Sequence, residues 1–550
     1  MNKAKKILAL LLVCLMAASI AACSSTTSGD TQTSSTPSSS APNGSAPSTT
    51  APSTTDASPK KDTLEIQVDS DAGSLSPASV SGGGLYTALP CLYESLWEVD
   101  EQGNVIYLLA ESVDQESPTQ WIVHLRQGVK FANGNPLTAD DVIFSIEYFK
   151  GVGVNSVRVQ SLDVPNCKAI DDYTVDLRMT SFYVMNWSAC SQLTIYDAES
   201  FDVDALSRQP NGTGPYNVKE YVPNSHLFLD RRDDYWGTKP EIAHLHFRII
   251  SEPSQISNSL DTGKLDIATI ALQDYDHVST LPGFTINERA TGGGVQISFN
   301  SGKNGYFNRF TDPDKSLQAR RAVIAAIDPT AIINLVYYGH AEPMKCVVPN
   351  FCIDYIPEKY DNMDETYKFG FNLDRANQLA TSSGLAGQTI TLMTNGLPAS
   401  VQMAEIIQGM LAQINVTVRI ENYDPATTQT MIYDPEAKYD MSISPGIAPN
   451  RRVCDLLVNG VRYSKVLSAP GAFPDNENYL KIAPTTITTV DDTERQAVTQ
   501  EVLGMFMHNC LTYALCQQKT CIAMNKGIDQ NSVRFAITTG FIRWMDLKWA

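Results

Sequence analysis

The residues most suggestive of chemistry are two adjacent carboxylates, Asp140 and Asp141, which follow the turn "NGNP" and precede the apolar run "VIFSIEYF". Two carboxylates can act as general acid and base when they flank one scissile bond. Adjacent residues on a helix point in different directions, so this pair cannot flank one bond. Thr138 stands at the N-cap position, where first-turn carboxylates bond free backbone N–H groups and complement the helix dipole. The sequence therefore predicts a structural role.

Other catalytic patterns are missing from the sequence. It contains no G-x-S-x-G, H-E-x-x-H, P-loop or G-x-G-x-x-G motif. His244 and His246 share one face of an expected strand, but no third metal ligand lies near them in the sequence. We therefore expect no catalytic residue, no metal site and no cofactor.

The N-terminus has the layout of a bacterial secretory signal, with lysines, an apolar run and small residues before Cys23. The run of about 16 residues is short of the ~20 that a membrane-spanning helix needs. The segment "IAAC" resembles a lipobox, which predicts a signal peptide over residues 1–22 and a lipid on Cys23. Such an anchor holds a protein on a membrane without spanning it. The alternative is a plain signal peptide with an incidental cysteine.

Residues 23–60 are mostly Ser, Thr and Pro, so they cannot bury enough apolar surface to fold and should form a disordered linker. Residues 61–550 exceed the ~250–300 residues that one core supports, which predicts at least two lobes. The formal net charge of −19 argues against nucleic acid as a partner.

The body holds an odd number of cysteines and no C-x-x-C pair. Export permits disulfides. The candidates are Cys346–Cys352 and a pair among Cys510, Cys516 and Cys521.

Hydrophobic periodicity predicts a mixed α/β fold. The order strand 388–395, helix 400–415, strand 416–423 implies a parallel sheet with a crossover helix. A further short helix is expected around residues 89–96, and Asp328-Pro329 should end one helix and begin the next.

Six segments, in order, resemble one family: "LYESLWEVDEQGNVIYLLAES", "WIVHLRQGVKFANGNPLTADDVIFSI", "GTGPYNVKEY", "LDRRDDYWGTKP", "LDTGKLDIATI" and "QARRAVIAAIDPTAIINLVYYGHAEP". Together they are similar to the solute-binding proteins of peptide/nickel ABC importers, family 5, of the oligopeptide- and dipeptide-binding type. The resemblance covers nearly all of residues 63–480.

This resemblance implies a periplasmic-binding-protein-like fold of two hinged α/β lobes, with an extra sub-domain on the first lobe and the ligand cleft between the lobes. Ligand would be trapped by lobe closure. The family layout places the first lobe at 61–99, 206–295 and 521–550, the extra sub-domain at 100–205, and the second lobe at 296–520.

The resemblance also implies ligand contacts. The loop "GGGLYTALPC" makes Tyr86 and Thr87 candidates. The segment "YDMSISPGIAPNRRVCDLL" corresponds to the second-lobe wall and adds Ser444, Pro445 and Gly446.

One departure from the family pattern concerns the acidic residue that pairs a peptide's α-amino group. The chain has "APN" there, followed by Arg451 and Arg452, with Asp455 as a substitute. Arginines favour carboxylate or phosphate, although a solvated basic turn is the alternative. Phe541 and Trp544 could line the hinge side of the cleft, with core packing as the alternative.

The sequence thus favours a monomeric, lipid-anchored binding protein on the extracellular face of a bacterial membrane, which captures a peptide or peptide-like solute and delivers it to an ABC permease. The alternatives are a sensory or structural lipoprotein, a binder of a metal chelate or an anionic small molecule, and a surface hydrolase.

Overall fold

The computed structural model describes residues 61–550 except 81, 101, 153–155, 291–293, 301, 369, 446–451, 456, 459–472, 474–475 and 537–539. The expected signal peptide, Cys23, the linker, Gly446 and Arg451 lie outside the described residues. Within those residues, no helix combines the length and apolarity needed to cross a bilayer.

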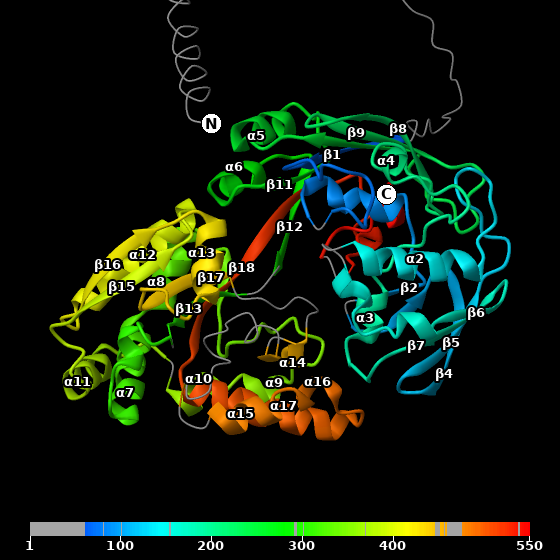
Figure 1. The fold of residues 1–550 in the computed structure, drawn as a ribbon. Helices are drawn as coiled ribbons and strands as arrows, with labels where there is room; N and C mark the ends of the chain where they lie inside the picture. Colours follow the sequence, from blue (N-terminus) through cyan, green and yellow to red (C-terminus); the bar gives the residue numbers. More distant parts are fainter. Residues whose placement is uncertain are drawn as a thin grey trace, which may run out of the picture. The chain divides into compact units, whose positions relative to one another are not determined.

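A 12-stranded sheet runs through the body (Figure 1). Its strands, in spatial order, are β16 (Thr417–Asn422), β15 (Thr389–Thr394), β17 (Met441–Pro445), β13 (Val295–Phe299), β18 (Thr512–Asn525), β11 (Ile267–Ile270), β1 (Thr63–Val68), β10 (His244–Ile249), β9 (His226–Arg231) and β8 (Tyr216–Val222). Two more, β12 (Phe284–Ala290) and β14 (Ala341–Pro343), pair with β18. β18 therefore belongs to both halves of the sheet.

The half that contains β1 has one large core. Leu64 and Ile66 of β1 are fully buried, because alternate residues of a strand face the same side. A second sheet, of order β4 (Ala110–Ser117), β5 (Gln120–Leu125), β7 (Thr174–Arg178) and β6 (Lys168–Asp171), contributes Trp121 to the same core. Residues 100–205 thus have their own sheet but share a core with β1, and the proposed sub-domain boundary stays a prediction.

Asp140 and Asp141 lie in the first turn of helix α2 (Ala139–Gly151), and the structure confirms that this helix is capped. Asp141 Oδ2 accepts hydrogen bonds from the backbone N–H (2.8 Å) and hydroxyl (3.0 Å) of Thr138. Its Oδ1 accepts the N–H of Ala198 at 2.9 Å. Asp141 is buried and Asp140 is exposed, so the two carboxylates act apart and the structural interpretation is confirmed.

The second half has its own core, built on the predicted βαβ unit. β15 and β16 are parallel, and helix α12 (Pro398–Ala412) connects them, as expected. Helices α7 (Pro313–Ala326) and α8 (Pro329–Val336) meet at Asp328, whose carboxylate caps α8 by accepting the N–H of Thr330 at 2.9 Å. Helix α17 (Asp492–His508) also packs into this core.

The expected helix at residues 89–96 is wrong. The chain instead forms a 3₁₀ helix, η1 (Gly84–Cys91), and then enters β2 (Trp97–Val99), which pairs with β3 (Val105–Tyr107). Pro90 lies inside η1 and has no N–H to donate to the carbonyl of Tyr86, so an α-helical hydrogen bond is missing at this position.

The candidate disulfides are also wrong. All nine cysteines between residues 61 and 550 are buried, and the structure joins none of them in a disulfide. Cys346 instead donates its S–H to the carbonyl of Val348 at 3.3 Å.

Candidate functional site

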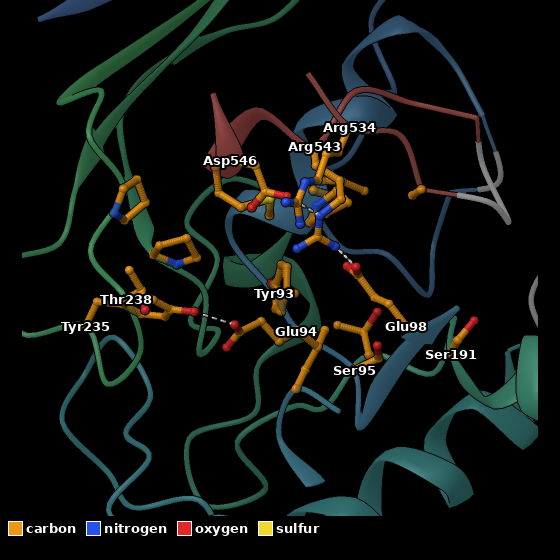
Figure 2. Close-up of a pocket in the computed structure, with 18 of the residues that line it drawn as sticks. Tyr93, Glu94, Ser95, Glu98, Ser191, Tyr235, Thr238, Arg534, Arg543 and Asp546 are labelled. Carbon is orange, nitrogen blue, oxygen red and sulfur yellow. Dashed lines mark hydrogen bonds and ion pairs between the residues drawn. The ribbon is translucent and has the colours of Figure 1, made fainter. Parts of the chain in front are cut away.

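A cavity of about 690 Å³ opens among segments that are far apart in the sequence (Figure 2). η1 and the strand after it form one wall, residues 235–241 another, and the segment after β18 a third. The described residues that line it with polar side chains include Tyr86, Tyr93, Glu94, Glu98, Arg158, Gln192, Tyr235, Arg534, Arg543 and Asp546.

Arg158 is the unusual charge of this cavity. It is only 6% exposed, and its guanidinium lies over the ring of Phe149 at 5.7 Å. Nη2 donates to the hydroxyl of Tyr86 at 2.6 Å, and Nη1 donates to the carbonyl of Gln192 at 3.0 Å. Both acceptors are neutral. Among the described residues no carboxylate lies within ion-pair distance of Arg158.

Arg543 is neutralised, in contrast. It forms ion pairs with Glu98 and with Asp546, the latter at 2.7 Å from Nε (Figure 2). These three side chains join β2 to the C-terminal segment, so they form part of the cavity wall.

Glu94 is the carboxylate that a hydrolase hypothesis would select, because burial raises its pKa. Its Oε1 accepts the hydroxyl of Tyr235 at 2.7 Å (Figure 2). Its Oε2 accepts the indole N–H of Trp236 at 2.9 Å. Both oxygens are therefore held by side chains of the 235–241 segment. The geometry assigns Glu94 to anchoring that segment.

Tyr86 and Thr87, the two ligand contacts expected from the first lobe, lie in different surroundings. Tyr86 lines the cavity and packs edge-on against Phe541, with ring centroids 6.0 Å apart. Thr87 is buried, and its hydroxyl and carbonyl oxygens accept the indole N–H of Trp544 at 2.9 and 3.0 Å. Trp544 packs edge-on against Phe247. Thr87 and Trp544 therefore hold η1 to the core and do not line this cavity.

The expected second-lobe residues are only partly described. Ser444 and Pro445 end β17, where their backbones pair with Gln296 and Val295 of β13. Arg452 is half-buried directly before helix α14 (Val453–Asp455). Their contact with ligand stays a prediction.

The histidine pair also has a structural explanation. His244 bonds Asp230 at 2.6 Å, and His246 bonds Glu65 at 2.9 Å, both through Nδ1. The described part of the chain contains no group of three or more His, Cys, Asp or Glu residues placed to hold a metal ion.

Sequence reasoning missed Arg158, Glu98 and Arg543. The segment "VNSVRVQS" around Arg158 carries no motif, and its partner Tyr86 lies 72 residues away. No sequence signal could have found this contact.

Comparison with known proteins identifies the family. Residues 104–453 match the model of the bacterial extracellular solute-binding proteins, family 5 (middle). The chain belongs to this family. It is 25% identical over 389 residues to a dipeptide-binding protein of Escherichia coli, a match that covers 62% of this chain and 64% of that relative, less than two thirds of its length.

Solved structures of the family share the mixed α/β fold. The ABC transporter substrate-binding protein CtaP from Listeria monocytogenes superposes with a TM-score of 0.75 at 20% identity, over 89% of this chain and 99% of that one. NikA from Brucella suis, solved in complex with Fe(III)-EDTA, gives 0.75 at 19% identity, over 89% and 100%. The Escherichia coli relative is named a dipeptide-binding protein and CtaP an ABC transporter substrate-binding protein.

Proposed function

We propose that this family 5 protein captures a peptide or peptide-like solute by lobe closure and delivers it to the permease of an ABC importer. The observation that most supports this proposal is the cavity of about 690 Å³ beside η1. Its volume falls within the ~300–1,000 Å³ typical of small-molecule sites. Tyr86 and Arg158 are the proposed contacts of this wall. The second-lobe contacts are Ser444, Pro445, Gly446, Arg451 and Arg452.

The arrangement of cores supports closure as the capture step. One buried cluster contains β13, α7 and α12, and another contains β1, β9 and β10, while β18 contributes residues to both. Two compact cores on one continuous strand are suited to hinge motion.

Lipid anchoring on the extracellular face is the second part of the proposal. Cys23 would carry the lipid after removal of residues 1–22, and residues 23–60 would tether the body. Expression of Cys23→Ala with the wild-type leader tests this idea, because the variant should move from the membrane fraction to the medium. Retention of the variant on the membrane would contradict it.

A metal chelate bearing carboxylates is a second candidate ligand. The observation that favours it is Arg158, a buried cation that no carboxylate of the described residues pairs with, since chelating ligands commonly present carboxylate oxygens. A sensory lipoprotein that binds the same ligand without transport would share this site.

Native mass spectrometry of the purified protein, followed by mild denaturation, tests the ligand directly. Release of short peptides would support the peptide proposal, and release of a metal complex would favour the second candidate. A protein that is empty and that no peptide pool stabilises against heat would contradict peptide binding.

A further inference from the structure

We infer that Arg158, together with Tyr86, forms an anion subsite that receives a carboxylate of the ligand. The inference rests on the proposed binding function and narrows it to carboxylate-bearing ligands. Arg158 is not among the ligand contacts that the sequence predicted.

The first step is the unbalanced charge. A buried charge is costly unless an opposite charge or several hydrogen bonds compensate it. Arg158 is 6% exposed, and its hydrogen-bond partners among the described residues are a phenol oxygen and a carbonyl. A guanidinium has five N–H donors, and the described residues accept from two of its nitrogens, one bond each.

The second step is a comparison with two other arginines of the same core. Arg232, which is 2% exposed, bonds the carboxylate of Asp234 and several carbonyls. Arg543 has carboxylates on both sides. Each is therefore compensated inside the protein. In the described part of the chain Arg158 bonds neutral groups, and it lines a cavity.

The third step is a second donor at the right place. Tyr86 accepts a hydrogen bond from Arg158, so the phenol's own O–H proton is not used in that contact. Both residues line the cavity. A carboxylate can therefore take a guanidinium N–H on one oxygen and the phenol O–H on the other. Charge-assisted bonds of this kind are the strong ones.

A peptide and a metal chelate can both present a carboxylate, so the experiment must separate them. Isothermal calorimetry on the whole protein in mild detergent would use three probes. They are a pool of synthetic tri- to pentapeptides as free acids, the same pool as C-terminal amides, and Fe(III)-EDTA. The variants are Arg158→Gln, Arg158→Lys and Tyr86→Phe. Arg419→Gln is the matched control, because it removes an arginine that is exposed on β16 and does not line the cavity.

The expected result is a coupling between Arg158 and the ligand carboxylate. Arg158→Gln should raise the Kd of the free acids about 10- to 150-fold, the range for a hydrogen bond to a charged group. The same variant should leave the weaker binding of the amides nearly unchanged. Arg158→Lys should retain part of the affinity because it keeps the charge, and Arg419→Gln should bind like the wild type. Coupling seen with Fe(III)-EDTA alone would support the subsite and assign it to a chelate.

Two results would overturn the inference while leaving binding intact. The first is equal affinity for the free acids and the amides, together with equal affinity for peptides with and without acidic side chains. This result would show that the protein recognises neither a C-terminal nor a side-chain carboxylate. An equal loss for acids and amides in Arg158→Gln would show that Arg158 only positions Tyr86 and Gln192. If no probe binds the wild type, the proposed function fails together with the subsite. Circular dichroism of each variant identifies misfolding, in which case Arg158→Lys and Tyr86→Phe carry the test.

Discussion

Replacement of Asp141 by alanine, compared with the same change at Asp140, tests the structural interpretation of the carboxylate pair. The two residues are adjacent and chemically identical, but one is buried with three donors and the other is exposed. Asp141→Ala leaves the N–H groups of Thr138 and Ala198 without their acceptor. An unpaired buried donor costs about 1–3 kcal/mol, and these two contacts are part-buried. We therefore expect a loss of about 2–4 kcal/mol in the free energy of unfolding.

Asp140→Ala removes only a charge near the helix N-terminus, worth about 0.3–1 kcal/mol. Urea unfolding followed by tryptophan fluorescence measures both variants. Trp97, Trp121 and Trp187 lie within 4.3–5.9 Å of one another, between ring centroids, in the core beside α2, and so report on this region. Shifts of the urea midpoint that agree within about 0.5 kcal/mol for the two variants would refute the reasoning, provided that the slope with urea is unchanged.

Three further outcomes are expected. Trp544→Phe should destabilise the protein by about 1–3 kcal/mol in the same assay, because it removes both hydrogen bonds to Thr87; an unchanged midpoint would contradict this. The Tyr275 hydroxyl lowers the pKa of Glu288, so the stability from this contact is present above the ordinary pKa of 4.5 and is lost as the pH falls through the lowered value. Tyr275→Phe should therefore flatten the acid-side decline of stability, and an identical pH profile would count against the contact. The nine buried cysteines should react with a thiol reagent only after unfolding and without prior reduction; fewer than nine reactive thiols would reveal a disulfide.

Local features were predictable from the sequence where neighbouring residues determine them. The cap of α2, the Asp328 boundary between α7 and α8 and the parallel βαβ unit each depend on residues within about 30 positions. The helix expected at residues 89–96 was mispredicted because its apolar spacing was given more weight than Pro90, which lies inside the 3₁₀ helix that forms there instead.

The cavity could not be predicted, because it is made by long-range contacts that periodicity does not encode. Arg158 meets Tyr86 across 72 residues, and Trp544 meets Thr87 across 457. The sequence places Trp544 near the C-terminus, where an aromatic residue could line a cleft or pack in a core. Its hydrogen bonds to Thr87 distinguish the two, and they are visible only in the structure. The family resemblance correctly predicted the fold, but it drew attention to Arg451 and Arg452, whereas the described structure offers Arg158.

The pairing of β18 suggests where lobe closure, if it occurs as proposed, would bend the chain. One edge of β18 pairs with β13 at residues 512–516 and with β12 at 519–525, which leaves residues 517 and 518 outside the ladders of that edge. The other edge pairs with β14 at 516–518 and with β11 at 521–524, which leaves residues 519 and 520 outside the ladders of that edge. Lys519 lies where both edges change their partner strand, and it contacts Glu288 of β12 at 3.6 Å and Glu342 of β14 at 3.0 Å. Twist is therefore easiest at 517–520, where each residue belongs to a ladder on one edge only, while Lys519 links β12 and β14 across the strand as it turns.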